Sequence, residues 1–199
     1  IQQVFIRKAY QVLRNHLSLK ANNKFTTQLA VSTHSSHIAH EIDFKCLRYF
    51  KRQNIPKARI HTSIVVNLSK TFGTEDDTTK FAIRYLKTTH CDLFFADAAI
   101  LIEGPAERML IPHFIEHHHE TLSSCFISIL EIGGSYAHTL RPLIQDLGII
   151  TLVITDLDSI HPTTKESIFS EKGKGYKTGN YKIKSWLPVK EELDEVIAV

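Results

Sequence analysis

The chain has 199 residues, enough for one large domain or for a small domain with part of another. Its hydrophobic content of 43% supports a buried core, and its net charge of +3 permits nucleic acid as a partner without arguing for it. Three scattered cysteines argue against a disulfide framework, and no apolar run approaches the ~20 residues that cross a bilayer, so we expect a cytoplasmic protein with no membrane contact.

The first part of the chain mixes helical and strand patterns. The expected elements, in chain order, are a helix over 1–20, a buried strand over 25–32, a helix capped by Ser35 or Ser36, strands over 46–51 and 60–68, and a helix over 78–88. Residues 70–80 break this pattern with Gly, Asp and Thr, and they are a candidate linker.

From residue 98 the pattern becomes strand, helix, strand, helix, strand. The expected strands are 98–102, 126–130 and 149–154, and the helices between them are 106–118 and 135–147. The first and last of these strands are continuous apolar runs, which is typical of a parallel sheet covered on both faces. We therefore predict an α/β fold with right-handed crossovers, in which a site forms at the carboxyl ends of the strands.

Acidic side chains follow all three of these predicted strands. Glu103, Glu131 and Asp156 each lie just past a strand end. Glu107 is four residues after Glu103, on the same face of the next helix, and Asp158 is two residues after Asp156. Two converging carboxylate pairs repel each other unless a cation lies between them, and hard oxygen ligands select Mg²⁺ or Mn²⁺. The alternative is that Glu107 only caps a helix and Asp158 only begins a turn.

The residues around these carboxylates resemble a known family. Glu-Gly at the first strand, Gly133-Gly134 after the second and Asp-x-Asp after the third are similar to the Toprim domain of topoisomerases, primases and some nucleases. The segments 101–110, 130–138 and 154–159 resemble the OLD (overcoming lysogenization defect) nucleases, whose Gabija relatives act in phage defence. Thr178-Gly179-Asn180 with residues 184–188 resembles that family's segment after the Asp-x-Asp motif.

The resemblance implies a DNA endonuclease that uses two Mg²⁺ or Mn²⁺ ions. By analogy Glu103, Asp156 and Asp158 are the catalytic metal-binding residues, Glu107 completes the metal set, and Glu131 and Ser159 are weaker candidates. A lysine near the scissile phosphate is also expected, and we do not identify it in this sequence; Lys174, Lys177 and Lys184 are poor substitutes.

In this family an ABC-type ATPase precedes the Toprim nuclease. The resemblance thus implies the end of an ATPase domain at 1–72, a linker helix at 73–92 and a Toprim domain at 93–199 that is incomplete at its C-terminus, all within a longer protein. His34, at a strand end, is similar to the switch histidine that senses the γ-phosphate of ATP. No P-loop motif occurs, so ATP and a homodimer formed through the ATPase part are expected only of the full-length protein.

Other patterns leave alternatives open. His113, Glu116 and His117 match a zinc-protease motif, although a solvated helix end explains them better. The Asp-x-Asp motif also resembles the nucleophile loop of haloacid-dehalogenase-like phosphatases. Lys174, Lys177 and Lys184 lie among aromatic residues and suit either a DNA-binding strip or a solvated loop. A Toprim module that binds DNA or nucleotide without cutting it is the alternative function.

Overall fold

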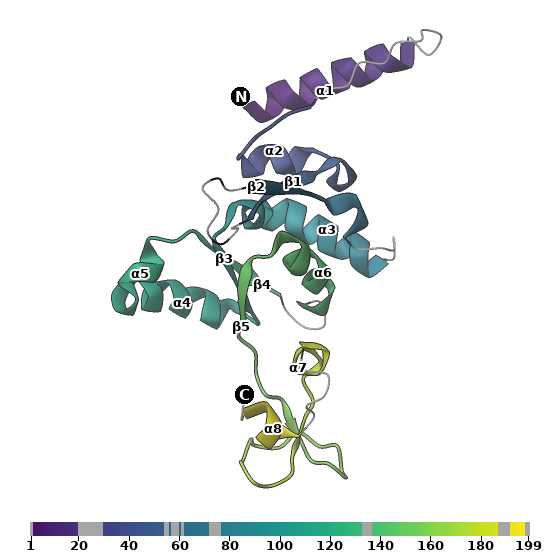
Figure 1. Cartoon of the computed structure of the whole chain (residues 1–199). Coiled ribbons are helices and arrows are strands. Elements are labelled where there is room, and N and C mark those ends of the chain that lie inside the picture. The colour runs from purple at the N-terminus through teal and green to yellow at the C-terminus, as the bar shows by residue number, and fades with distance from the viewer. Residues whose placement is uncertain are drawn as a thin grey trace.

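The computed structural model describes residues 2–19, 30–53, 56, 60, 62–71, 77–132, 137–186 and 192–197 (Figure 1). In chain order the helices, 3₁₀ helices (η) and strands are α1 (Gln2–Leu19), α2 (Ser36–Glu41), η1 (Phe44–Cys46), β1 (Arg48–Gln53), β2 (Thr62–Asn67), η2 (Leu68–Lys70), α3 (Asp77–Thr89), η3 (Cys91–Phe95), β3 (Ala98–Ile102), α4 (Pro105–His118), α5 (Glu120–Ser123), β4 (Ile127–Glu131), α6 (Ala137–Leu147), β5 (Ile150–Val153), β6 (Ser159–Ile160), β7 (Lys177–Thr178), α7 (Tyr181–Trp186) and α8 (Leu193–Ile197).

A parallel three-stranded sheet organises the chain after residue 98. Its strand order is β4-β3-β5, so the first strand in sequence is the central one. Ala99 pairs with Ser128 of β4 and with Thr151 of β5, in parallel register on both sides. α4 and α6 form the crossovers between the strands, as Figure 1 shows. The predicted α/β fold with a parallel sheet is therefore confirmed.

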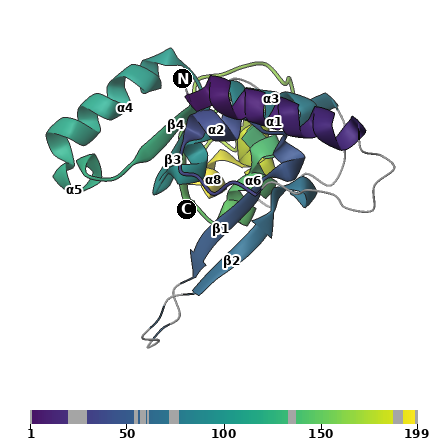
Figure 2. The same cartoon turned by 90° about the horizontal axis from the view of Figure 1, so that it is seen from above.

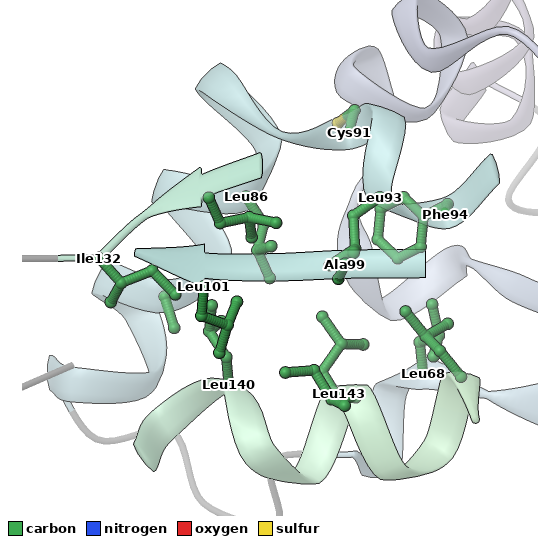
Figure 3. Packing of buried hydrophobic residues seen from close by; sticks show 14 of the residues in the cluster. Leu68, Leu86, Cys91, Leu93, Phe94, Ala99, Leu101, Ile132, Leu140 and Leu143 are labelled. Atoms are coloured by element: carbon green, nitrogen blue, oxygen red, sulfur yellow. The ribbon is translucent and has the colours of Figure 1, made fainter. Parts of the chain in front are cut away.

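One face of this sheet holds the core of the domain. Leu101 of β3 extends towards Leu140 of α6, with Leu143 one turn further along the helix (Figure 3). Leu130 of β4 lies on the same face, since it is the register partner of Leu101. Leu130 and Leu143 are fully buried, as is Leu86 of α3. Burial of these apolar side chains fixes the direction of the strands and hence the position of their carboxyl ends.

The opposite face is less covered than the sequence predicts. Ile150 is 80% exposed and Leu152 is 55% exposed, so the expectation that β5 is covered on both faces is wrong. The reason lies in the crossover helix α4, which packs against β4 at the other edge of the sheet and has no buried side chain. Seen from above, α4 and α5 extend away from α6 (Figure 2).

The segment before residue 72 shares the core of the sheet domain. Ala39, Phe44 and Leu68 belong to the same buried cluster as Leu93 and Phe94. The rings of Phe44 and Phe94 are tilted with centroids 6.3 Å apart. The predicted strands near 46–51 and 60–68 form the antiparallel hairpin β1–β2, which projects to one side in Figure 2. The core therefore continues across the predicted domain boundary, which itself remains a prediction.

Three further expectations have different outcomes. Ser35 is the N-cap of α2, as predicted, although its side chain makes no capping hydrogen bond. Most of the predicted strand at 25–32 lies outside the described residues, and residues 30–32 are exposed and not in a strand. Among the described helices, none is long and apolar enough to cross a membrane.

A buried histidine and tyrosine support the end of β4. His90 is 5% exposed and lies against the Tyr85 ring, with centroids 4.9 Å apart. The Tyr85 hydroxyl donates to the main-chain oxygen of Glu131 at 2.5 Å. Burial, and then the nearby Glu131 carboxylate, raise the pKa of Tyr85 to about 12. Burial lowers the pKa of His90. The folded protein thus favours the neutral forms of the Tyr85 and His90 side chains.

Replacement of Leu143 by alanine is expected to lower the free energy of unfolding by about 2–5 kcal/mol, because it leaves a cavity between α6 and the sheet. The matched control is Leu152→Ala, at a side chain that is 55% exposed, with an expected change within about 0.5 kcal/mol. Urea unfolding measures both. Equal losses for the two variants would contradict the assignment of the two faces.

Stability is expected to fall as the pH drops below 6.5, the ordinary pKa of histidine. The pKa of His90 is lowered in the fold, so its contribution is present above pH 6.5 and is lost as the pH falls through the folded-state pKa. The facing charges are Asp92 and Glu131, which favour protonation, and Arg108, which opposes it. Melting temperatures between about pH 7.5 and about pH 5.5 should decline less for His90→Gln than for the unchanged protein.

The control for this pH series is His113→Gln, because His113 is exposed on α4. His113→Gln should keep the acid-side decline of the unchanged protein. If His90→Gln also keeps the full decline, buried neutral His90 does not contribute to it.

Candidate metal centre at the carboxyl end of the parallel sheet

Glu103 lies where the sequence predicts, directly after the central strand. β3 ends at Ile102, and α4 begins at Pro105, so Glu103 occupies the short turn between them and is half-buried. The Thr155 hydroxyl, which follows the neighbouring strand β5, donates a hydrogen bond to Glu103 Oε1. Parallel pairing of β3 and β5 is what brings these two side chains together across 52 residues of sequence.

The Asp-x-Asp motif lies in a loop and not on a strand. β5 ends at Val153, and Asp158 has a positive φ of 46°, in the left-handed region. Two aspartates two residues apart point the same way only if the strand continues through them, and β5 ends before the motif. Both residues are exposed. The positions of both aspartates therefore depend on contacts between the loop and residues much later in the chain.

Those contacts come from the segment 178–180. The Thr178 hydroxyl donates to the main-chain oxygen of Leu157 at 2.7 Å, and the Gly179 N–H donates to that of Asp158 at 2.6 Å. A Cβ atom at Gly179 would lie 2.9 Å from the same Asp158 oxygen, so the close approach requires glycine. Thr178 is fully buried. Residues 178–180 thus hold the Asp-x-Asp loop in place, and we call this segment the clamp.

Asn180 connects this clamp to Glu103. Its side chain is almost fully buried, with 5% of the residue exposed. Four oxygen atoms lie within hydrogen-bond distance of its Nδ2 atom: Asp156 O at 2.7 Å, Asp158 Oδ2 at 2.9 Å, Thr155 Oγ1 at 3.0 Å and Glu103 Oε1 at 3.4 Å. The carboxylates of Glu103 and Asp158 therefore meet at one nitrogen atom. Sequence reasoning assigned no role to Asn180.

The remaining predicted ligands have other contacts. Glu107 lies in the first turn of α4, where its Oε2 accepts the Gly104 N–H at 3.1 Å, which fits the capping alternative. Glu131 ends β4 beside Ile102 and is half-buried. Ser159 is 3% exposed, and its hydroxyl is 2.5 Å from that of Ser170. Their roles as metal ligands stay predictions.

The donor atoms suit a hard cation, although the ligand set is not closed. Glu103 Oε1, Asp158 Oδ2 and Asp156 O are all oxygen donors, the type that Mg²⁺ and Mn²⁺ prefer. In the described part of the chain, no three His, Cys, Asp or Glu side chains converge closely enough to hold a metal ion. The chemistry of these residues therefore fits a divalent ion, and two of the carboxylates, those of Glu103 and Asp158, contact the same amide nitrogen.

The predicted residues outside this centre are spread over the surface. His34 is exposed and lines a cavity of about 720 Å³ with Phe5, Ile6 and Ser32. Lys174 lies 3.8 Å from Glu171 in an exposed ion pair. Lys177 in β7 and Lys184 in α7 are half-buried. These three lysines belong to the small C-terminal unit that also supplies Asn180.

The His-rich end of α4 does not resemble a zinc centre. The His113 and His117 rings are tilted by 36° with centroids 4.2 Å apart, and His117 Nδ1 is 2.9 Å from the His113 carbonyl oxygen. Both residues are exposed, and within the described ranges no third His, Cys, Asp or Glu side chain joins them. The solvated helix end is the better interpretation.

Comparisons with known proteins find sequences that are similar to this chain. Residues 94–158 match the family model described as "Overcoming lysogenization defect protein-like, TOPRIM domain". The chain is 28% identical over 207 aligned positions to a protein named Endonuclease GajA from Bacillus cereus strain HuB5-5, covering 98% of the chain and 30% of that protein. A second Endonuclease GajA, from strain VD045, is 24% identical over 143 positions, which cover 72% of the chain and 23% of that protein.

The chain spans less than a third of the length of either relative. The matched region 94–158 contains Glu103, Glu107, Glu131 and the Asp-x-Asp motif. Residues 94–158 are therefore similar to the Toprim domain of OLD-like proteins.

Proposed function

We propose that this chain is the Toprim part of a divalent-metal-dependent endonuclease that hydrolyses phosphodiester bonds of DNA. The main support for this proposal is that Glu103 and Asp158 contact the same amide nitrogen at the carboxyl end of a parallel sheet. The surrounding sequence matches an OLD-like Toprim domain. The name Endonuclease, given to both relatives, agrees with it.

Glu103, Asp156 and Asp158 hold the metal ions in this proposal, with Glu107 beside them and Glu131 and Ser159 as weaker candidates. Bound Mg²⁺ or Mn²⁺, as two ions, supplies a nucleophile at neutral pH and offsets the charge on the attacking and leaving oxygens of the phosphodiester. The chain's own part is to fix the carboxylates. Thr155 orients one Glu103 oxygen by donating to it, and Asn180 links Glu103 to Asp158.

DNA reaches the centre along the C-terminal unit. Lys174, Lys177 and Lys184 supply positive charge there, next to the elements that hold the Asp-x-Asp loop. This arrangement positions the phosphate backbone without reading base sequence.

The full-length protein is proposed to couple this centre to ATP. Residues 1–72 are the end of an ABC-type ATPase domain, His34 is its switch histidine, and a homodimer forms through the ATPase part. Packing of Phe44 against Phe94 gives that segment a direct contact with η3, the element that leads into β3 and Glu103. Phage defence is the proposed biological context.

A second candidate function is a Toprim module that binds DNA or nucleotide without cutting it. It is favoured by one observation, that in the residues the structure describes no three potential ligand side chains converge on one point. The two functions differ in whether DNA is cleaved.

Nicking of supercoiled plasmid by the protein at its full natural length tests the proposal. With Mg²⁺ or Mn²⁺, Glu103→Gln and Asp156→Asn are expected to slow nicking by about 10³-fold or more, because charge stabilisation by the metal is worth several kcal/mol and each ~1.4 kcal/mol is tenfold in rate. The control Glu116→Gln makes the same change at an exposed carboxylate on α4 and should nick normally.

The contrary outcomes are distinct. DNA binding by the unchanged protein with no nicking in either metal favours the non-cleaving module. Nicking that persists in both variants removes these carboxylates from the reaction. Release of phosphate from small phosphoesters without DNA cleavage favours the phosphatase alternative.

A further inference from the structure

We infer that Asn180 is the positioning residue of the carboxylate centre: its amide nitrogen holds Glu103 and the Asp-x-Asp loop in one arrangement before a cation arrives. The inference rests on the proposed metal-binding role of Glu103 and Asp158. It concerns a residue outside the matched region 94–158, on a segment of the chain that follows the Asp-x-Asp motif by more than twenty residues.

The backbone fixes the direction in which the Asn180 amide points. Its N–H donates to the Thr178 hydroxyl at 3.0 Å, and its side-chain Oδ1 accepts the Ile183 N–H at 3.4 Å. Asn180 therefore caps the start of α7, and its main-chain oxygen also accepts from the Lys184 N–H at 3.2 Å. With Oδ1 turned to the helix, Nδ2 must face the carboxylates. The hydrogen-bond pattern thus determines which amide atom is nitrogen.

The surroundings of Nδ2 consist of oxygen atoms from two strand ends. Glu103 follows β3, whereas Thr155, Asp156 and Asp158 follow β5. An amide nitrogen carries two hydrogens, and here it has four oxygen neighbours within 3.4 Å, so the hydrogens are shared among them.

The contact of the Asn180 amide with two carboxylates matters because it offsets their electrostatic repulsion. Glu103 and Asp158 carry like charges that approach a common point, and the positive ends of the Asn180 N–H groups offset their repulsion. Asn180 is 5% exposed, so water has little access to replace these donors. Removal of the amide would free the two carboxylates to separate, and metal affinity would fall because the ligands would have to be gathered again on binding.

Two substitutions separate this role from helix capping. Asn180→Asp keeps an oxygen that caps α7 about as well as asparagine does, yet it replaces the two N–H donors by a third negative charge. Asn180→Ala loses the cap and the donors without adding charge. A capping role alone predicts that aspartate is tolerated better than alanine. The positioning role predicts the opposite order in the absence of metal.

The first measurement is thermal unfolding of the full-length protein in EDTA. Asn180→Asp should lower the melting temperature more than Asn180→Ala does, by an additional shift on the order of 5 °C. Addition of Mn²⁺ should reverse that order, because the added carboxylate is then beside a cation. If aspartate is tolerated better than alanine in EDTA, Asn180 is only a helix cap and the inference is wrong.

The second measurement is Mn²⁺ affinity by isothermal titration calorimetry. Asn180→Ala should weaken binding by about 10- to 100-fold, the range found when groups that orient metal ligands are removed. The matched control is Asn67→Ala, which removes a side chain that caps η2 by accepting the Ser69 N–H, and it should bind Mn²⁺ normally.

The outcomes also separate this inference from the proposed function. If the unchanged protein binds Mn²⁺ and nicks DNA, and Asn180→Ala binds Mn²⁺ as tightly, the positioning role fails while the nuclease stands. If the unchanged protein binds no Mn²⁺, the metal role of the carboxylates fails and this inference fails with it. The metal-free melting order then still reports whether the amide offsets carboxylate repulsion.

Discussion

Glu103 and Asp158 accept hydrogen bonds from the same amide nitrogen, and the geometry of the candidate centre depends on that shared contact. Parallel strand pairing brings the carboxyl ends of β3 and β5 together, which places negative charges near one another. The Thr155 hydroxyl, just after β5, donates a hydrogen bond to Glu103. The donor that Glu103 shares with Asp158 comes from Asn180, 77 residues after Glu103 and later in the chain than the last strand of the sheet. The centre is therefore made by two parts of the chain, one that gathers the acids and one that holds them.

The parallel sheet was predictable because its signals are local and strong. The apolar run Ala98–Ile102 stops at Glu103, and Gly104 and Pro105 start the next helix, so β3 and α4 follow from sequence patterns alone. Gly148 ends α6 with a positive φ of 63°, as its position after the last apolar residue indicates. The positions of Glu103 and Glu131 then follow from where β3 and β4 end, whereas the Asp-x-Asp loop is also held by contacts from Thr178 and Gly179.

The contacts of the clamp were not predictable, because the resemblance that singles out Thr178-Gly179-Asn180 does not indicate which residues this segment touches. The Lys- and Gly-rich stretch before Asn180 has the composition of a loose loop, yet Thr178 within it is fully buried. Helix α7, capped by Asn180, follows directly. Long-range contacts from Thr178 to Leu157 and from Asn180 to Glu103 hold this part of the chain. The exposed face of β5 likewise depends on where α4 packs and not on its own sequence.

Anomalous scattering from crystals of the full-length protein soaked in Mn²⁺ tests the metal centre most directly. We expect Mn²⁺ peaks at the carboxyl end of β3, with Glu103 and Asp158 among the ligands. Peaks found only elsewhere, for example at the His-rich end of α4, or no peak at a Mn²⁺ concentration that supports nicking, would contradict it.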